Sequence, residues 1–274
     1  MHALPFVLSC AAAVILAPAL LRALRENGHV RANYRDRPLA FPFGVLSVAA
    51  ALIALIPLAL IERLDLGGVF HPETLTVAVY VLGVAFLGLV DDTLGGEPRG
   101  WRGHGRAVLR MQLSTGALKA AGSLGLALYA MSYMGLSTGR WLLASAVLVL
   151  ATNAFNLLDL RPGRSTKALV LLGAGLTIGG MSLRPLWAVG LFAGPALVAG
   201  VYDLRERAML GDTGANLLGA VAGLWLVTAL SGAGQVVALA LLAAITVYGE
   251  LRSISALVER TPGLRELDSW GRPS

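Results

Sequence analysis

The chain alternates between long apolar runs and short polar stretches along its whole length. A helix that crosses a membrane needs about 20 mainly apolar residues, and the strict alternation typical of a barrel strand is missing from these runs. Helices are therefore the expected element. The pattern predicts nine of them, at Leu4–Leu21, Phe41–Ile61, Thr74–Val90, Leu113–Tyr133, Trp141–Leu158, Ala168–Met181, Pro185–Tyr202, Gly211–Leu230 and Gly234–Tyr248.

Composition agrees with this pattern. Of the 274 residues, 56% are hydrophobic and 14% are charged, whereas soluble domains carry about 25% charged residues. We therefore predict an all-α, polytopic membrane protein with nine to ten transmembrane helices, forming one integral membrane domain over residues 1–274. The first apolar run has no basic segment before it and is too long for a signal peptide, so we expect it to be a retained span.

Basic residues predict the orientation of the helices. The polar stretches after the first, third, fifth, seventh and ninth runs hold 18 of the 22 Lys and Arg residues, and the opposite side holds Arg63, Arg140 and Arg184. Loops rich in Lys and Arg face the cytoplasm. We therefore expect a multi-pass protein of the cytoplasmic membrane, with any active site in the cytoplasmic loops. Because topology explains the arginines, the net charge of +6 does not indicate a nucleic-acid partner.

Three polar clusters lie at the predicted cytoplasmic helix ends. The first is the pair Asp91-Asp92 in LVDDTLGG. The second, in TNAFNLLDLRPGRS, includes Asn153, Asn156 and Asp159 at intervals of three residues, which places them near one helix face. The third is LGDTGANLLG at the start of the eighth run. Charged groups inside a membrane protein normally face water, a partner or a metal, so we expect one shared polar site.

Each cluster also has a structural explanation. Asp212, the acid of the third cluster, could cap its helix. Asn153 and Asn156 could form interhelical hydrogen bonds, and Asp91-Asp92 could be a solvated helix end. Carboxylate and amide oxygens suit Mg²⁺, however, and basic residues with helix N-termini suit phosphates. Together these groups favour phosphoryl transfer at the membrane surface.

The same motifs resemble those of the polyprenyl-phosphate N-acetylhexosamine-1-phosphate transferases, a superfamily that includes the peptidoglycan translocase. NYRDRPLAFPFGV resembles the first cytoplasmic loop of the family, and LVDDTLGG resembles its paired-aspartate motif. NAFNLLD and GDTGANLLG resemble its third and fourth motifs, in the same order. The chain is thus similar to a short, divergent member of this family.

The resemblance implies a reaction and a set of roles. Family members transfer a sugar 1-phosphate from a UDP-sugar, here expected to be a UDP-N-acetylhexosamine, to a polyprenyl phosphate and release UMP, which starts cell-envelope glycan synthesis. By this resemblance Asp212 and Asn156 would hold Mg²⁺, with Mn²⁺ as an alternative. Asp91, Asp92 and Asp159 would be catalytic. The implied partners are the lipid, the UDP-sugar and the membrane, and a homodimer is left open.

Some family features are missing here. Arg161 and Arg164 stand where the family has a second acid, and the histidine-containing loop of the peptidoglycan translocase is absent. The two arginines could bind a diphosphate, and Lys119, inside a predicted span, should face a phosphate or an acid unless it snorkels. The predicted substrate-binding residues are Asn33, Arg37, Arg106, Lys119, Asn153, Arg161, Arg164 and Asn216.

Two other functions remain open from the sequence. One is a relative without transferase activity that binds a lipid phosphate or a nucleotide. The other is an ion-coupled transporter, which the position of the acids disfavours, because they lie at one face whereas transporters place them near the midplane.

Overall fold

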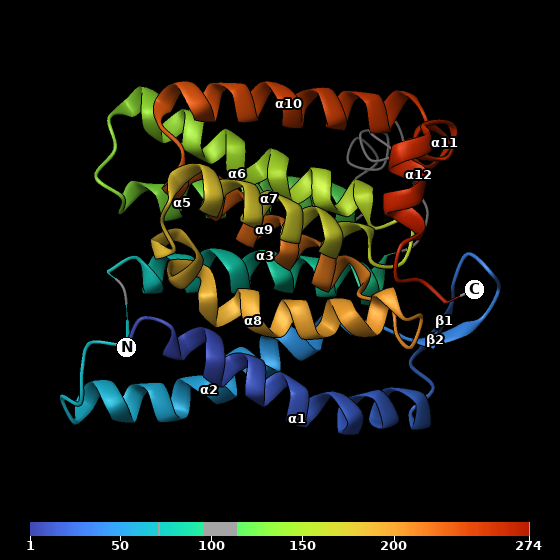
Figure 1. The fold of residues 1–274 in the computed structure, drawn as a ribbon, viewed down its shortest axis with the longest axis horizontal. Coiled ribbons are helices and arrows are strands. Elements are labelled where there is room, and N and C mark those ends of the chain that lie inside the picture. The colour runs from blue at the N-terminus through green and yellow to red at the C-terminus, as the bar shows by residue number, and fades with distance from the viewer. Residues whose placement is uncertain (71, 96–113, 274) are drawn as a thin grey trace.

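The computed structural model describes residues 1–70, 72–95 and 114–273 and is a bundle of long helices (Figure 1). A helix overlaps each of the nine predicted apolar runs. The bundle helices are α1 (Leu4–Glu26), α2 (Val45–Arg63), α3 (Thr74–Leu94), α5 (Thr115–Ser132), α6 (Thr138–Leu158), α7 (Arg164–Gly180), α8 (Arg184–Leu204), α9 (Gly211–Ala229) and α10 (Gly232–Leu251). Two short helices follow, α11 (Ile254–Arg260) and α12 (Pro262–Ser269).

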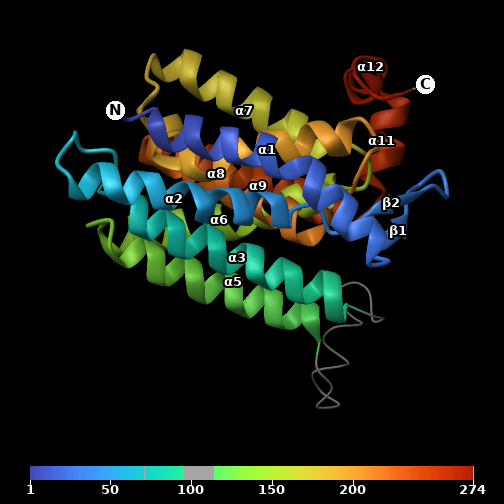
Figure 2. The same cartoon turned by 90° about the horizontal axis from the view of Figure 1, so that it is seen from below.

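Helix α9 is the centre of the bundle. It contacts α3, α6, α7 and α8, and every residue from Thr213 to Val227 is buried. Gly219 and Gly223 let it approach α6 closely, because a Cβ at either position would meet Ala151, Thr152 or Leu148. Small residues at such contacts are typical of membrane bundles. In Figure 1, α1 and α2 lie at the bottom of the bundle, below this centre, and in Figure 2, α3 and α5 lie along its lower side.

Six helices of the described chain are long and apolar enough to cross a membrane: α1, α2, α3, α6, α8 and α10. Large apolar side chains on their outer faces are exposed, among them Ile15, Ile56, Phe86 and Leu241, and an exposed apolar surface of this kind indicates contact with lipid. The chain is therefore a multi-pass membrane protein. The prediction of nine spans is not confirmed, since α5, α7 and α9 are not both long enough and apolar enough to be counted with these six. Neighbouring helices bury α9 along most of its length, so it carries glycines and polar residues without exposing them to lipid.

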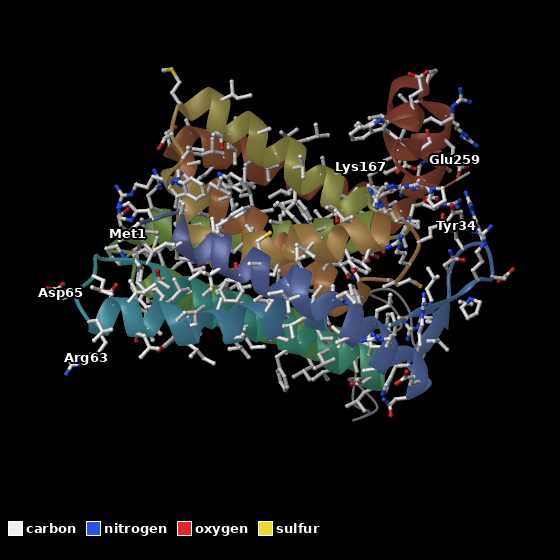
Figure 3. All side chains as sticks on the ribbon, turned by 60° about the horizontal axis from the view of Figure 1, so that its bottom comes forward. Met1, Tyr34, Arg63, Asp65, Lys167 and Glu259 are labelled. Carbon is white, nitrogen blue, oxygen red and sulfur yellow. The ribbon has the colours of Figure 1, made fainter. Side chains whose placement is uncertain are left out.

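The two ends of the bundle differ in their connections. Met1, Arg63 and Asp65 lie at one end, and Tyr34, Lys167 and Glu259 lie at the other (Figure 3). The second end carries a hairpin formed by β1 (Val30–Ala32) and β2 (Pro38–Ala40), together with α11 and α12. The structure thus gathers the predicted cytoplasmic stretches after the first, fifth and ninth runs at one end.

The hairpin is joined to the start of α9. Its strands are antiparallel, with Val30 opposite Ala40. The N–H of Met209 donates to the Ala40 carbonyl at 2.9 Å, and the N–H of Gly44 donates to the Leu210 carbonyl at 2.9 Å. The first cytoplasmic loop and the segment before GDTG therefore form one unit, although about 170 residues separate them in sequence.

Candidate functional site

The second aspartate of the LVDDTLGG pair caps the N-terminus of α9. Asp92 accepts the N–H groups of Asp212 and Thr213, each at 2.8 Å, and the Thr213 hydroxyl at 2.6 Å. A carboxylate at this position satisfies free helix amides and interacts favourably with the helix dipole. The expectation that these amides are open to an anionic ligand is therefore wrong for Asp212 and Thr213, because a side chain from α3 already binds both.

Glycines make this approach of α2 and α3 to α9 possible. A Cβ at Gly44 would overlap the backbone of Gly214, and one at Gly88 would overlap the carbonyl of Asp212. Gly211 has φ +72°, a conformation that glycine adopts without strain, and a Cβ there would lie 2.7 Å from an Asp92 carboxylate oxygen. These glycines bring the chain of α9 against the paired aspartates.

The first aspartate of the pair meets the third cluster through a lysine. Lys119 on α5 donates to Asp91 Oδ2 at 2.9 Å and also bonds Asp212 Oδ2. The two polar atoms of the Asn156 amide lie 3.2 Å from Asp212 Oδ1 and 3.2 Å from Lys119 Nζ, and both contacts are hydrogen bonds when the amide nitrogen faces the carboxylate. Four helices thus contribute to one cluster, here called the Lys119 cluster: Asp91, Lys119, Asn156 and Asp212.

The third predicted catalytic acid lies beside this cluster, at the end of α6. The Ser165 hydroxyl donates to Asp159 at 2.6 Å. Burial and, after it, the negative charge of Asp203 raise the pKa of Asp159 well above its ordinary value, against the effect of the Ser165 hydrogen bond. Asp203 itself accepts the N–H of Gly163 at 2.6 Å, so it fixes the turn that connects α6 to α7. Asp159 is therefore suited to holding a proton.

The predicted substrate-binding residues of the first loop form a second polar cluster. Asn33 donates to Glu206 at 3.2 Å and accepts the N–H groups of Arg35 and Arg37 at 2.8 and 3.0 Å. Arg35 and Arg37 also lie 3.7 and 3.8 Å from the Glu206 carboxylate. Tyr34 donates its hydroxyl to the same acid at 3.1 Å. Asn33 thus orders the hairpin, while Arg37 remains half exposed.

The two arginines after the third motif bind the C-terminal helices. Arg164 contacts Asp268 bidentately at 2.9 and 3.0 Å, and Arg161 lies 3.0 Å from Glu259 and 4.2 Å from the centre of the Tyr34 ring. Burial raises the pKa of Asp268, but hydrogen bonds from Arg164 and Arg272 outweigh it and lower that pKa to about 2. The Arg164 fork expected to hold a diphosphate is thus filled by a carboxylate of the chain itself.

The remaining predicted residues are placed differently. Asn153 donates to Thr246 at 3.3 Å and joins α6 to α10, as the interhelical alternative predicted. Asn216 lies one helical turn beyond Asp212, is 1% exposed, and neither polar atom of its amide has a hydrogen-bond partner among the described residues. Arg106 lies outside the described residues.

The donor chemistry at the Lys119 cluster fits a hard cation, although a lysine occupies the centre. Two carboxylates and an amide oxygen are the ligand types that Mg²⁺ prefers. Within the described ranges, no group of three or more His, Cys, Asp or Glu side chains is placed to hold a metal ion. Asp212 and Asn156, beside Asp91, would offer these ligands to Mg²⁺ only once the ammonium has left the cluster.

An apolar cavity of about 480 Å³ lies at the same end of the bundle. Its lining comes from α6, α7, α10, α11 and α12 and includes Leu158, Leu171, Tyr248 and Leu267, with Arg164, Lys167 and Asp268 at its polar part. Lys167 donates to the backbone carbonyls of residues 267, 268 and 270, which fixes α12 over the cavity.

Several residues of the site had no counterpart in the prediction. Thr213, Ser165, Asp203, Glu206 and Asp268 each complete a hydrogen bond described above. The sequence signal for two of them is visible in retrospect, since Asp203 and Glu206 are acids within a basic stretch that directly precedes GDTG. The other three are a hydroxyl or an acid in a polar segment, without a distinguishing pattern.

Comparison with known proteins adds no relative. A scan against models of protein families matches none of them, and a search of curated proteins finds no match.

Proposed function

We propose that this protein is a Mg²⁺-dependent phosphoglycosyl transferase of the cytoplasmic membrane, which transfers a sugar 1-phosphate from a UDP-sugar to a polyprenyl phosphate and releases UMP. The observation that carries the proposal is the Lys119 cluster, in which Asp91, Asn156 and Asp212 meet from three distant motifs. The cluster lies where the bundle helices end, close to the capped start of α9.

The residues of the cluster divide the work of phosphoryl transfer among them. Asp212 and Asn156 would hold Mg²⁺, which when bound neutralises charge on a diphosphate and polarises it. Asp91 positions the lipid phosphate, and Lys119 contacts phosphate oxygens. Asp92 orients the backbone that carries Asp212 and is thus a positioning residue. Positioning and charge neutralisation supply most of the rate in this type of reaction.

The apolar cavity supports a lipid acceptor. It lies between α7, α10 and the amphipathic α12, and its walls are almost entirely hydrocarbon. We place part of the prenyl chain there, with the phosphate directed toward the cluster. UDP-N-acetylhexosamine is the proposed donor because the four motifs resemble those of enzymes that use it.

The test is release of UMP by the purified protein in proteoliposomes that contain undecaprenyl phosphate and UDP-N-acetylglucosamine. Asp212→Asn should lower the rate at least about 100-fold, a typical effect of removing one electrostatic partner of the transition state. Asp65→Asn makes the same chemical change at the opposite end of the bundle (Figure 3) and should leave the rate unchanged.

Two outcomes would contradict the proposal. The wild type could release no UMP from any UDP-sugar while UDP or the lipid still raises its thermal stability, which would favour a non-catalytic binding protein. Alternatively, Asp65→Asn and Asp212→Asn could lower the rate equally, which would separate the activity from the cluster.

A further inference from the structure

The Lys119 ammonium lies between the carboxylates where a divalent cation would be held, so it competes with that cation for the site. Its ammonium has three N–H donors, and three oxygen atoms receive them: one each from Asp91, Asp212 and Asn156. The Lys119 side chain is 18% exposed, so water competes little for these contacts. The lysine is therefore fully bonded by the same oxygens that suit Mg²⁺.

The two carboxylates need a positive charge between them. Asp91 and Asp212 both contact one ammonium, so without it two negative charges would face each other in a partly buried site, which is unfavourable. A divalent cation can supply that charge instead. Held between the same two carboxylates, at about 2.0–2.1 Å from their oxygens for Mg²⁺, it would take the place of the ammonium and repel it. The lysine and the metal therefore exclude each other.

A diphosphate offers the lysine another partner. Lysine has a flexible four-carbon stem, so its ammonium can leave the carboxylates while α5 stays in place. The α9 amides of Asp212 and Thr213 cannot bind the phosphate, since Asp92 occupies both. Of the side chains that the structure describes, Lys119 is the cation that contacts this cluster, so a phosphate that approaches the cluster can pair with its ammonium.

We propose that Lys119 is a placeholder for the divalent cation, so that metal binding is weak until a diphosphate draws the ammonium away from Asp91 and Asp212. Metal and diphosphate then load together, and neither stays bound strongly alone. This inference rests on the proposed function for the identity of the diphosphate, but the exclusion of metal by lysine is a property of the chain itself.

The experiment measures Mn²⁺ binding by equilibrium dialysis of the purified protein in detergent, with inorganic pyrophosphate as the anion probe. Lys119→Met removes the ammonium and keeps the stem, and should bind Mn²⁺ at least tenfold more tightly than wild type without pyrophosphate. Lys119→Arg keeps the charge and is the matched control, with weak binding like wild type. Adding Asp212→Asn to Lys119→Met should abolish the gain.

The wild type provides a second measurement that does not depend on the folding of a variant. Bound Mn²⁺ is the excess of Mn²⁺ in the protein chamber over the protein-free chamber. For the wild type, adding pyrophosphate should raise this bound amount at least tenfold. Equal Mn²⁺ affinity of wild type and folded Lys119→Met, or no effect of pyrophosphate on wild type, would overturn the proposal. If Lys119 excludes Mn²⁺ as described but no UMP is released, the placeholder proposal is supported and the transferase function is refuted. If UMP is released but Lys119 does not exclude Mn²⁺, the transferase function is supported and the placeholder proposal is refuted.

Discussion

Replacing Asp92 by alanine should destabilise the protein more than replacing its neighbour Asp91. Asp92 accepts two backbone N–H groups and a hydroxyl at the start of α9. Loss of a helix cap costs about 0.5–2 kcal/mol, and a hydrogen bond to a charged group contributes about 1.5–3 kcal/mol. Because the contacts share one carboxylate, their effects overlap, and we expect a total loss of about 2–4 kcal/mol.

The matched variants separate capping from charge. Asp92→Asn keeps an acceptor oxygen, and Asn is as good a cap as Asp, so the expected loss is about 1 kcal/mol. Asp91→Ala removes one contact of Lys119 and leaves the contact with Asp212, so its loss should also be about 1 kcal/mol, as for a partly exposed ion pair.

The assay is the free energy of unfolding in mixed micelles, from the helical circular dichroism signal as a denaturing detergent is added. A loss below 0.5 kcal/mol for Asp92→Ala, judged against the usual ~0.5 kcal/mol spread of neutral surface changes, would refute the capping argument. Equal losses for Asp92→Asn and Asp92→Ala would refute it too, since they would show that charge and not the acceptor matters.

Three further predictions use the same measurement. Gly88→Ala should lower the free energy of unfolding by about 2 kcal/mol, in the range for overpacking, because the new Cβ meets the Asp212 carbonyl. The control is Gly125→Ala on α5, where nothing lies within 4 Å of the new Cβ, and it should be neutral or stabilising. Equal losses for the two variants would contradict the overpacking argument. The raised pKa of Asp159 means that the folded state holds the proton more tightly, so stability should fall as pH rises above the ordinary value of 3.8, and Asp159→Asn should remove that slope. The lowered pKa of Asp268 has the opposite sign: its contribution is present at neutral pH and should be lost as pH falls from about 4 to about 2, whereas Asp268→Asn should show no such loss.

The roles of the two acids in LVDDTLGG were not distinguishable from their sequence. Both follow the same apolar run, and both suit a metal or a phosphate. In the structure they point to different partners, Asp91 to Lys119 and Asp92 to the α9 amides. Consecutive helical residues differ by about 100° in direction, so which of them reaches α9 depends on how α3 is rotated against it.

For Lys119 the sequence predicted the kind of partner that the structure shows. A lysine inside an apolar run predicts a phosphate or acid partner, and the structure supplies two acids. The identity of those acids did not follow, because they lie 28 and 93 residues away in the chain. For Arg164, bidentate binding by the guanidinium predicted a diphosphate partner, and Asp268, 104 residues later, binds the guanidinium instead.

The sequence by itself determined the helices and the end of the bundle at which polar residues gather, because apolar run length and charge distribution are local properties with a direct physical cost in a membrane. Tertiary structure alone decided which donor meets which acceptor: Asp92 with the α9 amides, Lys119 between Asp91 and Asp212, Arg164 with Asp268. Each of these pairs depends on the rotation and close approach of helices that are distant in the chain, which in turn depend on glycine contacts such as Gly88 against Asp212.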